Sequence, residues 1–210
     1  MSCAICQIRR PRRFCPGVRG DICSICCGTE REVSVDCPFD CEYLREARRH
    51  EKQDADPALA PNQDIRLTEK FIQDHQALLN FIGRTIVNVS LSIDGAVDFD
   101  VREALDSLIR TYRTLQSGVY YESLPPNPLA AGIHRGVQES LGDYRRREVQ
   151  QLGVTRTRDA DVLGILAFLQ RVEFDHNNGR RRGRAFLDAL STYSSEPEPA
   201  GPSESPLILP

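Results

Sequence analysis

The chain has 210 residues, with 27 basic and 30 acidic side chains and a formal net charge of −3. This length accommodates one ordinary domain together with a smaller module, and the slightly acidic balance excludes a general nucleic-acid-binding protein. No apolar stretch approaches the roughly 20 residues that a membrane-spanning helix needs.

All eight cysteines lie in the first 41 residues, at Cys3, Cys6, Cys15, Cys23, Cys26, Cys27, Cys37 and Cys41. The N-terminus lacks the basic and apolar regions of a secretory signal, so we expect a cytoplasmic protein with reduced thiols. The spacing lacks the run of closely repeated C-x2-C steps that bacterial ferredoxins use for iron–sulfur clusters. Eight thiolates match two tetrahedral sites, and the sequence therefore predicts two Zn²⁺ ions per chain.

The adjacent pair Cys26 and Cys27 constrains how the ligands divide. Two neighbouring sulfurs rarely face one ion, so we expect the pair to be split between the sites. The resulting interleaved arrangement places one of the pair with Cys3, Cys6 and Cys23, and the other with Cys15, Cys37 and Cys41. Spacing does not decide which member joins which site.

Local sequence around the cysteines indicates a knuckle and a helix. Gly28 can take the positive φ that a metal-binding knuckle demands. Cys41 opens onto a charged stretch that is typical of a helix, and a helix N-terminus favours a thiolate ligand. A knuckle followed by a helix that begins at the second ligand pair is typical of a treble clef.

The same cysteines carry a resemblance to a known group of fingers. Cys3-Ala-Ile-Cys6, then Cys15-Pro16, then Cys23 to Cys27 resemble the binuclear zinc fingers of the HIT and MYND type, and also the cysteine-rich start of a group of uncharacterised bacterial proteins. Val18 stands where those fingers have a cysteine and Arg31 where a histidine would fall. The resemblance covers about a fifth of the chain and implies protein–protein recognition rather than catalysis.

Beyond the finger, the sequence predicts an all-α domain. We expect a zinc-binding module over residues 1–53, a linker over 54–64 with Pro57 and Pro61, a bundle of about five helices over 65–193, and a disordered tail over 194–210. The helices are expected from apolar stripes starting near residues 67, 100, 128, 159 and 180, with a capping box at Asp100 to Glu103.

Residues 86–99 are ambiguous between helix and hairpin. Their apolar residues alternate as in a strand, and Asp94-Gly95 could close a hairpin. A lone hairpin is marginally stable, and the rest of this domain offers no other strand. We therefore favour a helix that continues to about Ser92.

Catalytic patterns are sparse. Glu173 and His176 form one Glu-x-x-His step, whereas a di-iron carboxylate bundle needs two such steps and two further glutamates. His75 and His134 lie on apolar helical faces and are expected to be core histidines. A metal-dependent helical-bundle enzyme is therefore the third of our hypotheses. The two that we place before it are non-enzymatic and are given in the next paragraph.

Four arginines, Arg180, Arg181, Arg182 and Arg184, cluster at the expected start of the last helix. Cations there oppose the helix dipole, so we expect them to be neutralised by acidic groups. These groups would belong either to a phosphate, nucleic-acid or acidic protein partner, or to the chain itself. The internal candidates are Asp159, Asp161 and Glu173. The leading hypothesis is a zinc-binding protein-interaction or regulatory adaptor. The alternative is a nucleic-acid-binding regulator that uses this cluster. The partner, the process and the oligomeric state stay open.

Overall fold

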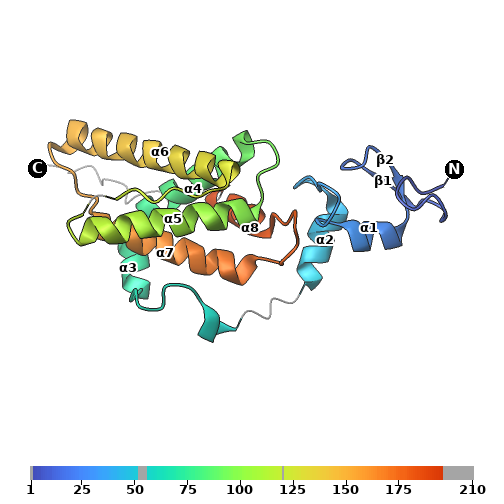
Figure 1. Cartoon of the computed structure of the whole chain (residues 1–210), viewed down its shortest axis with the longest axis horizontal. Helices are drawn as coiled ribbons and strands as arrows, with labels where there is room; N and C mark the ends of the chain where they lie inside the picture. Colours follow the sequence, from blue (N-terminus) through green and yellow to red (C-terminus); the bar gives the residue numbers. More distant parts are fainter. Residues whose placement is uncertain (1, 52–55, 120, 196–210) are drawn as a thin grey trace, which may run out of the picture.

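The computed structural model describes residues 2–51, 56–119 and 121–195. From residue 196 onward, the tail that was expected to be disordered lies outside the described residues. The chain is mostly helical, as predicted, and a small cysteine-rich module extends from one end of a helical bundle (Figure 1). None of the described helices combines the length and the apolar character needed to cross a bilayer.

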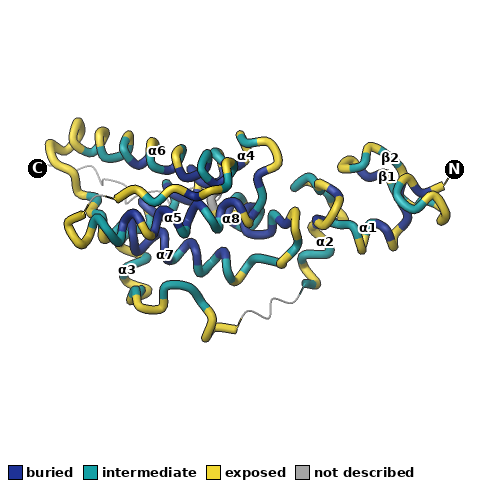
Figure 2. Tube along the Cα trace, in the orientation of Figure 1, coloured by how far each residue is buried: buried dark blue, intermediate teal, exposed yellow. Residues whose placement is uncertain are grey.

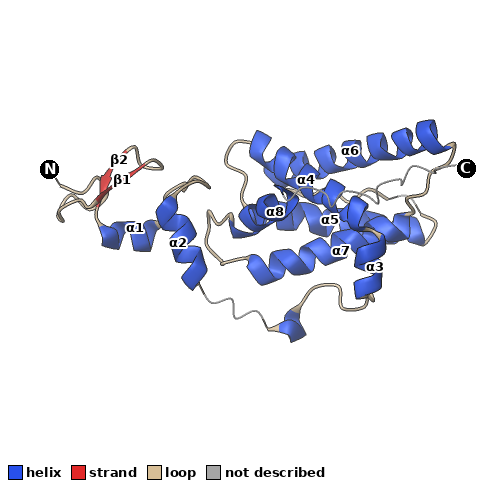
Figure 3. Cartoon of the chain, turned by 180° about the vertical axis from the view of Figure 1, so that it is seen from behind, coloured by secondary structure: helices blue, strands red, loops and turns tan. Residues whose placement is uncertain are grey.

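The cysteine-rich module contains a two-stranded antiparallel hairpin and two helices (Figure 3). Their bounds are β1 Arg13–Cys15, β2 Gly20–Ile22, α1 Ser24–Glu30 and α2 Glu42–His50. The module has its own small core, in which four cysteines pack with Ile22 and Val35. This core is separate from the core of the bundle.

The helical domain is built from α3 Glu69–Asp74, α4 Gln76–Ser92, α5 Asp98–Gln116, α6 Pro128–Leu152, α7 Asp159–His176 and α8 Ala185–Ser195. Helix α5 packs against α6, α7 and α8, while α4 packs against α6 and α8. Their apolar faces form one buried core, seen as the dark inner faces in Figure 2. The prediction of a helix as far as Ser92 is confirmed.

Three expected boundaries were wrong. The first expected helix divides into α3 and α4 at His75, whose Nδ1 lies 2.8 Å from the Phe71 carbonyl oxygen and so caps the short helix. Helix α5 begins at Asp98, because the Asp100 carboxylate accepts the N–H of Val97 and starts the helix one turn earlier than expected. Helix α8 begins at Ala185, so the arginine cluster lies in the preceding loop.

The start of α8 is set by a carboxylate from another helix. Asp98 is 1% exposed and accepts the backbone N–H groups of Phe186 and Leu187 at 2.9 and 3.1 Å. Helix N-termini need such acceptors because their first N–H groups have no partner within the helix. A tertiary contact therefore decides where this helix begins.

The second half of the expected linker is bound to the bundle. Arg113 pairs with Asp64 at 2.6 Å, and Arg171 donates to the carbonyl oxygens of Asn62 and Ile65 at 2.6 and 2.7 Å. These contacts tie residues 61–65 to α5 and α7. A short 3-10 turn, Pro57–Leu59, precedes them.

Candidate metal centre and its attachment to the bundle

Four cysteines converge at the end of the module that lies far from the bundle. The sulfurs of Cys3, Cys6, Cys23 and Cys26 all lie within 4.8 Å of one another and could hold a metal ion. Four sulfurs in tetrahedral positions around zinc would be about 3.8 Å apart for a bond of about 2.3 Å. The donor set therefore fits a four-thiolate ion after a small contraction. Cys26, and not Cys27, belongs to this group.

The local backbone explains how the four sulfurs meet. Cys3 and Cys6 flank a tight turn that is completed by Gln7 at φ 56°, and Cys23 is the N-cap of α1. Cys26 follows one turn later on the same face of α1. Gly28 does not supply the knuckle, as had been expected, because it lies inside α1; the non-glycine residue Gln7 takes the left-handed conformation instead.

Backbone N–H groups point at these thiols. Burial raises the pKa of Cys3, but the N–H groups of Cys6, Cys23 and Ile5 outweigh it and lower that pKa to about 6. Burial and the neighbouring thiols raise the pKa of Cys26 to about 12. Without a cation, the cluster therefore carries less than its full thiolate charge, since like charges this close oppose one another.

The sulfurs of the remaining four cysteines, Cys15, Cys27, Cys37 and Cys41, are less closely grouped. In the described part of the chain they form no group of the same tightness. Burial and the charges of Glu32, Cys15 and Cys41 raise the pKa of Cys37, so Cys15 and Cys41 lie within electrostatic reach of it. Cys27 and Cys37 pack against the module core that includes Cys15.

Arginines accompany both sets of thiols. The side chain of Arg9 hydrogen-bonds to Cys23, and with the nearby charges of Cys6 and Cys26 this raises the arginine's pKa. Arg31, where a HIT or MYND finger would have a histidine, places Nη2 3.9 Å from the Cys27 sulfur. These contacts support charge compensation of the thiol sites as one role of the basic residues in the module.

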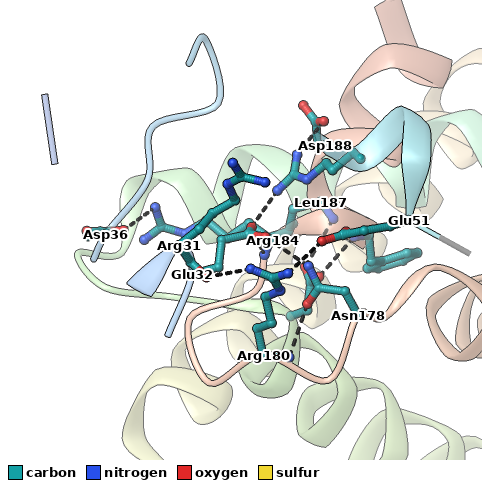
Figure 4. Close-up of polar contacts among 12 residues, drawn as sticks. Arg31, Glu32, Asp36, Glu51, Asn178, Arg180, Arg184, Leu187 and Asp188 are labelled. Carbon is teal, nitrogen blue, oxygen red and sulfur yellow. Dashed lines mark hydrogen bonds and ion pairs between the residues drawn. The ribbon is translucent and has the colours of Figure 1, made fainter. Parts of the chain in front are cut away.

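Glu32 attaches the module to the bundle (Figure 4). It is 1% exposed and takes φ 54°. Its carboxylate accepts hydrogen bonds from Arg48 at 2.6 Å, from Asn178 at 2.8 Å and from the backbone N–H of Arg184 at 3.1 Å. Its carbonyl oxygen accepts the N–H of Arg182 at 2.7 Å. One side chain of the module thus joins α2 to the loop before α8.

Two of the four clustered arginines strengthen this attachment. Arg180 pairs with Glu51 at 2.9 Å and donates to the carbonyl oxygen of Arg31 at 2.8 Å. Arg184 pairs with Asp36 at 2.8 Å and donates to the carbonyl oxygen of the bundle residue Ala96 at 2.8 Å. Arg180 and Arg184 are therefore engaged within the chain.

The acidic mates expected for the cluster were the wrong ones. Asp159 pairs with Arg145, Asp161 with His75, and Glu173 with Arg102. The expected pairing rested on a helix that began at Arg180. Because α8 begins later, the loop turns the arginines toward the module instead.

In the described residues, Glu173 and His176 belong to no group of three or more converging metal-ligating side chains. Glu173 is 1% exposed, and its carboxylate accepts from Arg102 at 2.9 Å and from Asn177 at 2.7 Å. The Nδ1 atom of His176 lies 2.9 Å from the Val172 carbonyl oxygen. Both groups have structural contacts at the end of α7.

The two other histidines differ from one another. His75 contacts the Phe71 carbonyl and lies 3.3 Å from Asp161. His134 is fully buried, and burial lowers its pKa. Neither ring nitrogen of His134 makes a hydrogen bond with the described residues, and Glu122 lies 4.0 Å away.

Sequence reasoning missed Glu32 and Asp98. Both are buried carboxylates whose partners are distant in the sequence, and neither stands in a recognisable motif. Glu32 lies in a polar run between two cysteines, and Asp98 is three residues after a glycine turn. No local signal distinguishes them from exposed acidic residues.

Comparison of the chain with protein-family models, with curated proteins and with solved structures finds no match in any of the three.

Proposed function

We propose that the chain is a non-enzymatic protein-interaction adaptor whose cysteine-rich module holds two Zn²⁺ ions. The observation that carries the proposal is the compact group of four thiols, Cys3, Cys6, Cys23 and Cys26. Four protein ligands close a zinc coordination sphere and leave no position for substrate, which is typical of structural rather than catalytic zinc. All eight cysteines are free thiols, in line with a reducing compartment, which we propose to be the cytoplasm.

The second ion would be held by Cys15, Cys27, Cys37 and Cys41. Cys41 is the N-cap residue of α2 and makes no side-chain capping bond, so its thiol is available as a ligand at a helix N-terminus. The electrostatic contact of Cys37 with Cys15 and Cys41 supports the grouping. The resemblance to the binuclear HIT and MYND fingers also implies a second ion.

Exposed apolar side chains of the module support an interaction role. Ile8, Phe14 and Ile25 are 87%, 62% and 53% exposed, although they belong to a module with a very small core of its own. Arg10 and Arg12 are exposed in the same module. Exposed apolar side chains in a module that also exposes cations fit an acidic protein segment with apolar side chains as the partner.

Capture from a cell extract, followed by binding measurements with the purified partner, tests this function. Phe14→Ser and Ile25→Ser should each weaken binding by about tenfold or more. Leu91→Ser and Leu152→Ser alter bundle residues of similar exposure, 55% and 48%, and should leave binding unchanged. Equal binding by all four variants would overturn the proposed surface.

A further inference from the structure

A cavity of about 630 Å³ lies between the loop that precedes α8 and the first turn of α5. Its size is within the range of small-molecule sites. Five arginines line it, namely Arg102, Arg180, Arg181, Arg182 and Arg184. Arginines from two different elements therefore line one partly open cavity.

The carboxylates in the wall of the cavity are already engaged. Asp36 pairs with Arg184 at 2.8 Å. Asp100 accepts the N–H of Val97 at 2.8 Å and the side-chain amide of Asn127 at 2.6 Å. Neither carboxylate makes an ion pair with another arginine of the cavity.

Three of the five arginines also have acidic partners. Arg102 pairs with Glu173, Arg180 with Glu51 and Arg184 with Asp36, as described above. Within the ranges that the structure describes, Arg181 and Arg182 have no acidic partner, and both are exposed. Two guanidinium charges at the cavity are thus uncompensated.

The loop presents these two side chains from a fixed backbone. The Arg182 N–H donates to the Glu32 carbonyl at 2.7 Å, and the Gly183 N–H donates to the Arg180 carbonyl at 2.9 Å. The Arg180 N–H is held by the Asn178 side chain at 3.1 Å. A fixed backbone lowers the entropic cost of placing two guanidinium groups on one ligand.

The first turn of α5 forms the opposite wall, where Phe99 lines the cavity. Asp98 and Asp100 lie in this first turn, so carboxylates already occupy the positive end of the helix, and the arginines supply the attraction for an anion. The N-terminus of α8 is likewise occupied, because Asp98 and Glu32 accept its first N–H groups.

We propose that this cavity binds a phosphate monoester of a small molecule, with Arg181 and Arg182 pairing with the phosphate oxygens. A monoester carries nearly two negative charges at neutral pH, which matches the two uncompensated guanidinium groups. Arginine forks bind phosphate oxygens bidentately. The concave wall favours a terminal phosphate over the continuous backbone of a nucleic acid. This inference goes beyond the adaptor function and does not depend on it.

Titration calorimetry on the full chain as purified, with inorganic phosphate and pyrophosphate, tests the site. Saturable millimolar or tighter binding is expected, and Arg181→Gln/Arg182→Gln should weaken it by about tenfold or more. The control Arg110→Gln/Arg135→Gln removes two exposed charges that do not line the cavity and should change affinity by less than about twofold.

Three outcomes overturn the proposal: no saturable binding at millimolar phosphate, equal losses in both double variants, or tighter binding of single-stranded RNA than of pyrophosphate. If Arg181→Gln/Arg182→Gln loses its helical circular dichroism signal, its affinity no longer tests the site. Chemical protection of the wild-type chain is then used as the test. Pyrophosphate should then protect Arg181 and Arg182 from phenylglyoxal, as mapped by mass spectrometry. Unchanged modification of both residues would count against the site.

Discussion

The carboxylate of Glu32 accepts the backbone N–H of Arg184 at 3.1 Å, although 152 residues separate them in the chain. The same carboxylate also binds Arg48 and Asn178, and Arg48 pairs in addition with Asp188 of α8. Glu32 is therefore the buried centre of the polar contacts that connect the cysteine-rich module to the bundle. The module and the bundle have separate apolar cores, but Phe39 of the module packs against the core of the bundle, so the contact has an apolar part beside these hydrogen bonds.

Glu32→Gln should destabilise the folded chain by about 3 kcal/mol, because it leaves the largely buried Arg48 without its full counter-charge. The free energy of unfolding from urea titration measures this. Glu139→Gln, at an exposed position on α6, is the matched control and should change stability by less than about 0.5 kcal/mol. Similar small effects of both substitutions would contradict the role given to Glu32.

The four clustered arginines should divide into two pairs. Arg180→Gln/Arg184→Gln removes two partly buried ion pairs and should lower the free energy of unfolding by about 1–3 kcal/mol. Arg181→Gln/Arg182→Gln should change it by less than about 0.5 kcal/mol, since both side chains are exposed. Thermal or urea unfolding of the two double variants compares them directly. Equal destabilisation would show that all four arginines hold the module.

Cys26→Ser and Cys27→Ser should each reduce the zinc content from two ions to one, but at different sites. Cys26 belongs to the compact group with Cys3, whereas Cys27 does not. Metal analysis with thiol counting gives the stoichiometry. Cadmium-113 NMR of the cadmium-loaded variants should show the loss of a different resonance in each. A wild-type chain with one ion, or loss of the same resonance in both variants, would contradict the two-site arrangement.

Chelation should unfold the module and leave the bundle helical. Structural zinc contributes on the order of 10 kcal/mol to folding its own module, whereas the bundle core contains none of the eight cysteines. Circular dichroism should therefore keep most of its helical signal, while limited proteolysis should cut within residues 1–51. Because an unfolded module would no longer hold the Glu32 contact, the bundle should melt at a lower temperature after chelation than before it. Loss of most helical signal would show that the bundle cannot fold without the module.

Asp98 should make stability depend on pH. Burial raises its pKa from 3.8 to about 7, against the two backbone N–H groups that favour the carboxylate. Because the folded pKa is raised, the folded state binds the extra proton, and stability falls as the pH rises from about 4 to about 7. Asp98→Asn weakens the cap of α8 and does not titrate. Its destabilisation relative to the wild type should therefore be larger at pH 5 than at pH 7.5.

Urea midpoints of the wild type and Asp98→Asn at these two pH values check the prediction. Using the difference between the two proteins cancels the effect of acid on the thiols. A destabilisation that grows from pH 5 to pH 7.5 would show that the two capping hydrogen bonds, rather than burial, control the pKa of Asp98.

The sequence by itself determined the helical class of the main domain and the position of the candidate metal centre. Apolar stripes recur at helical spacing, and this local pattern predicted α4 as far as Ser92. The adjacent pair Cys26 and Cys27 likewise predicted that Cys3, Cys6 and Cys23 share one group with one member of the pair, because two neighbouring sulfurs rarely face one ion. Both inferences depend on local patterns in the sequence.

Only the tertiary structure decided where α8 begins and what the arginines contact. Asp98 caps α8 from another helix, so the helix starts at Ala185 instead of Arg180. Glu32 reaches the loop before α8 across most of the chain length. A buried carboxylate and an exposed one look alike in a sequence. The buried carboxylate loses its water on folding, and donors that are distant in the sequence replace that water. Where such donors come to lie depends on how the module and the bundle pack.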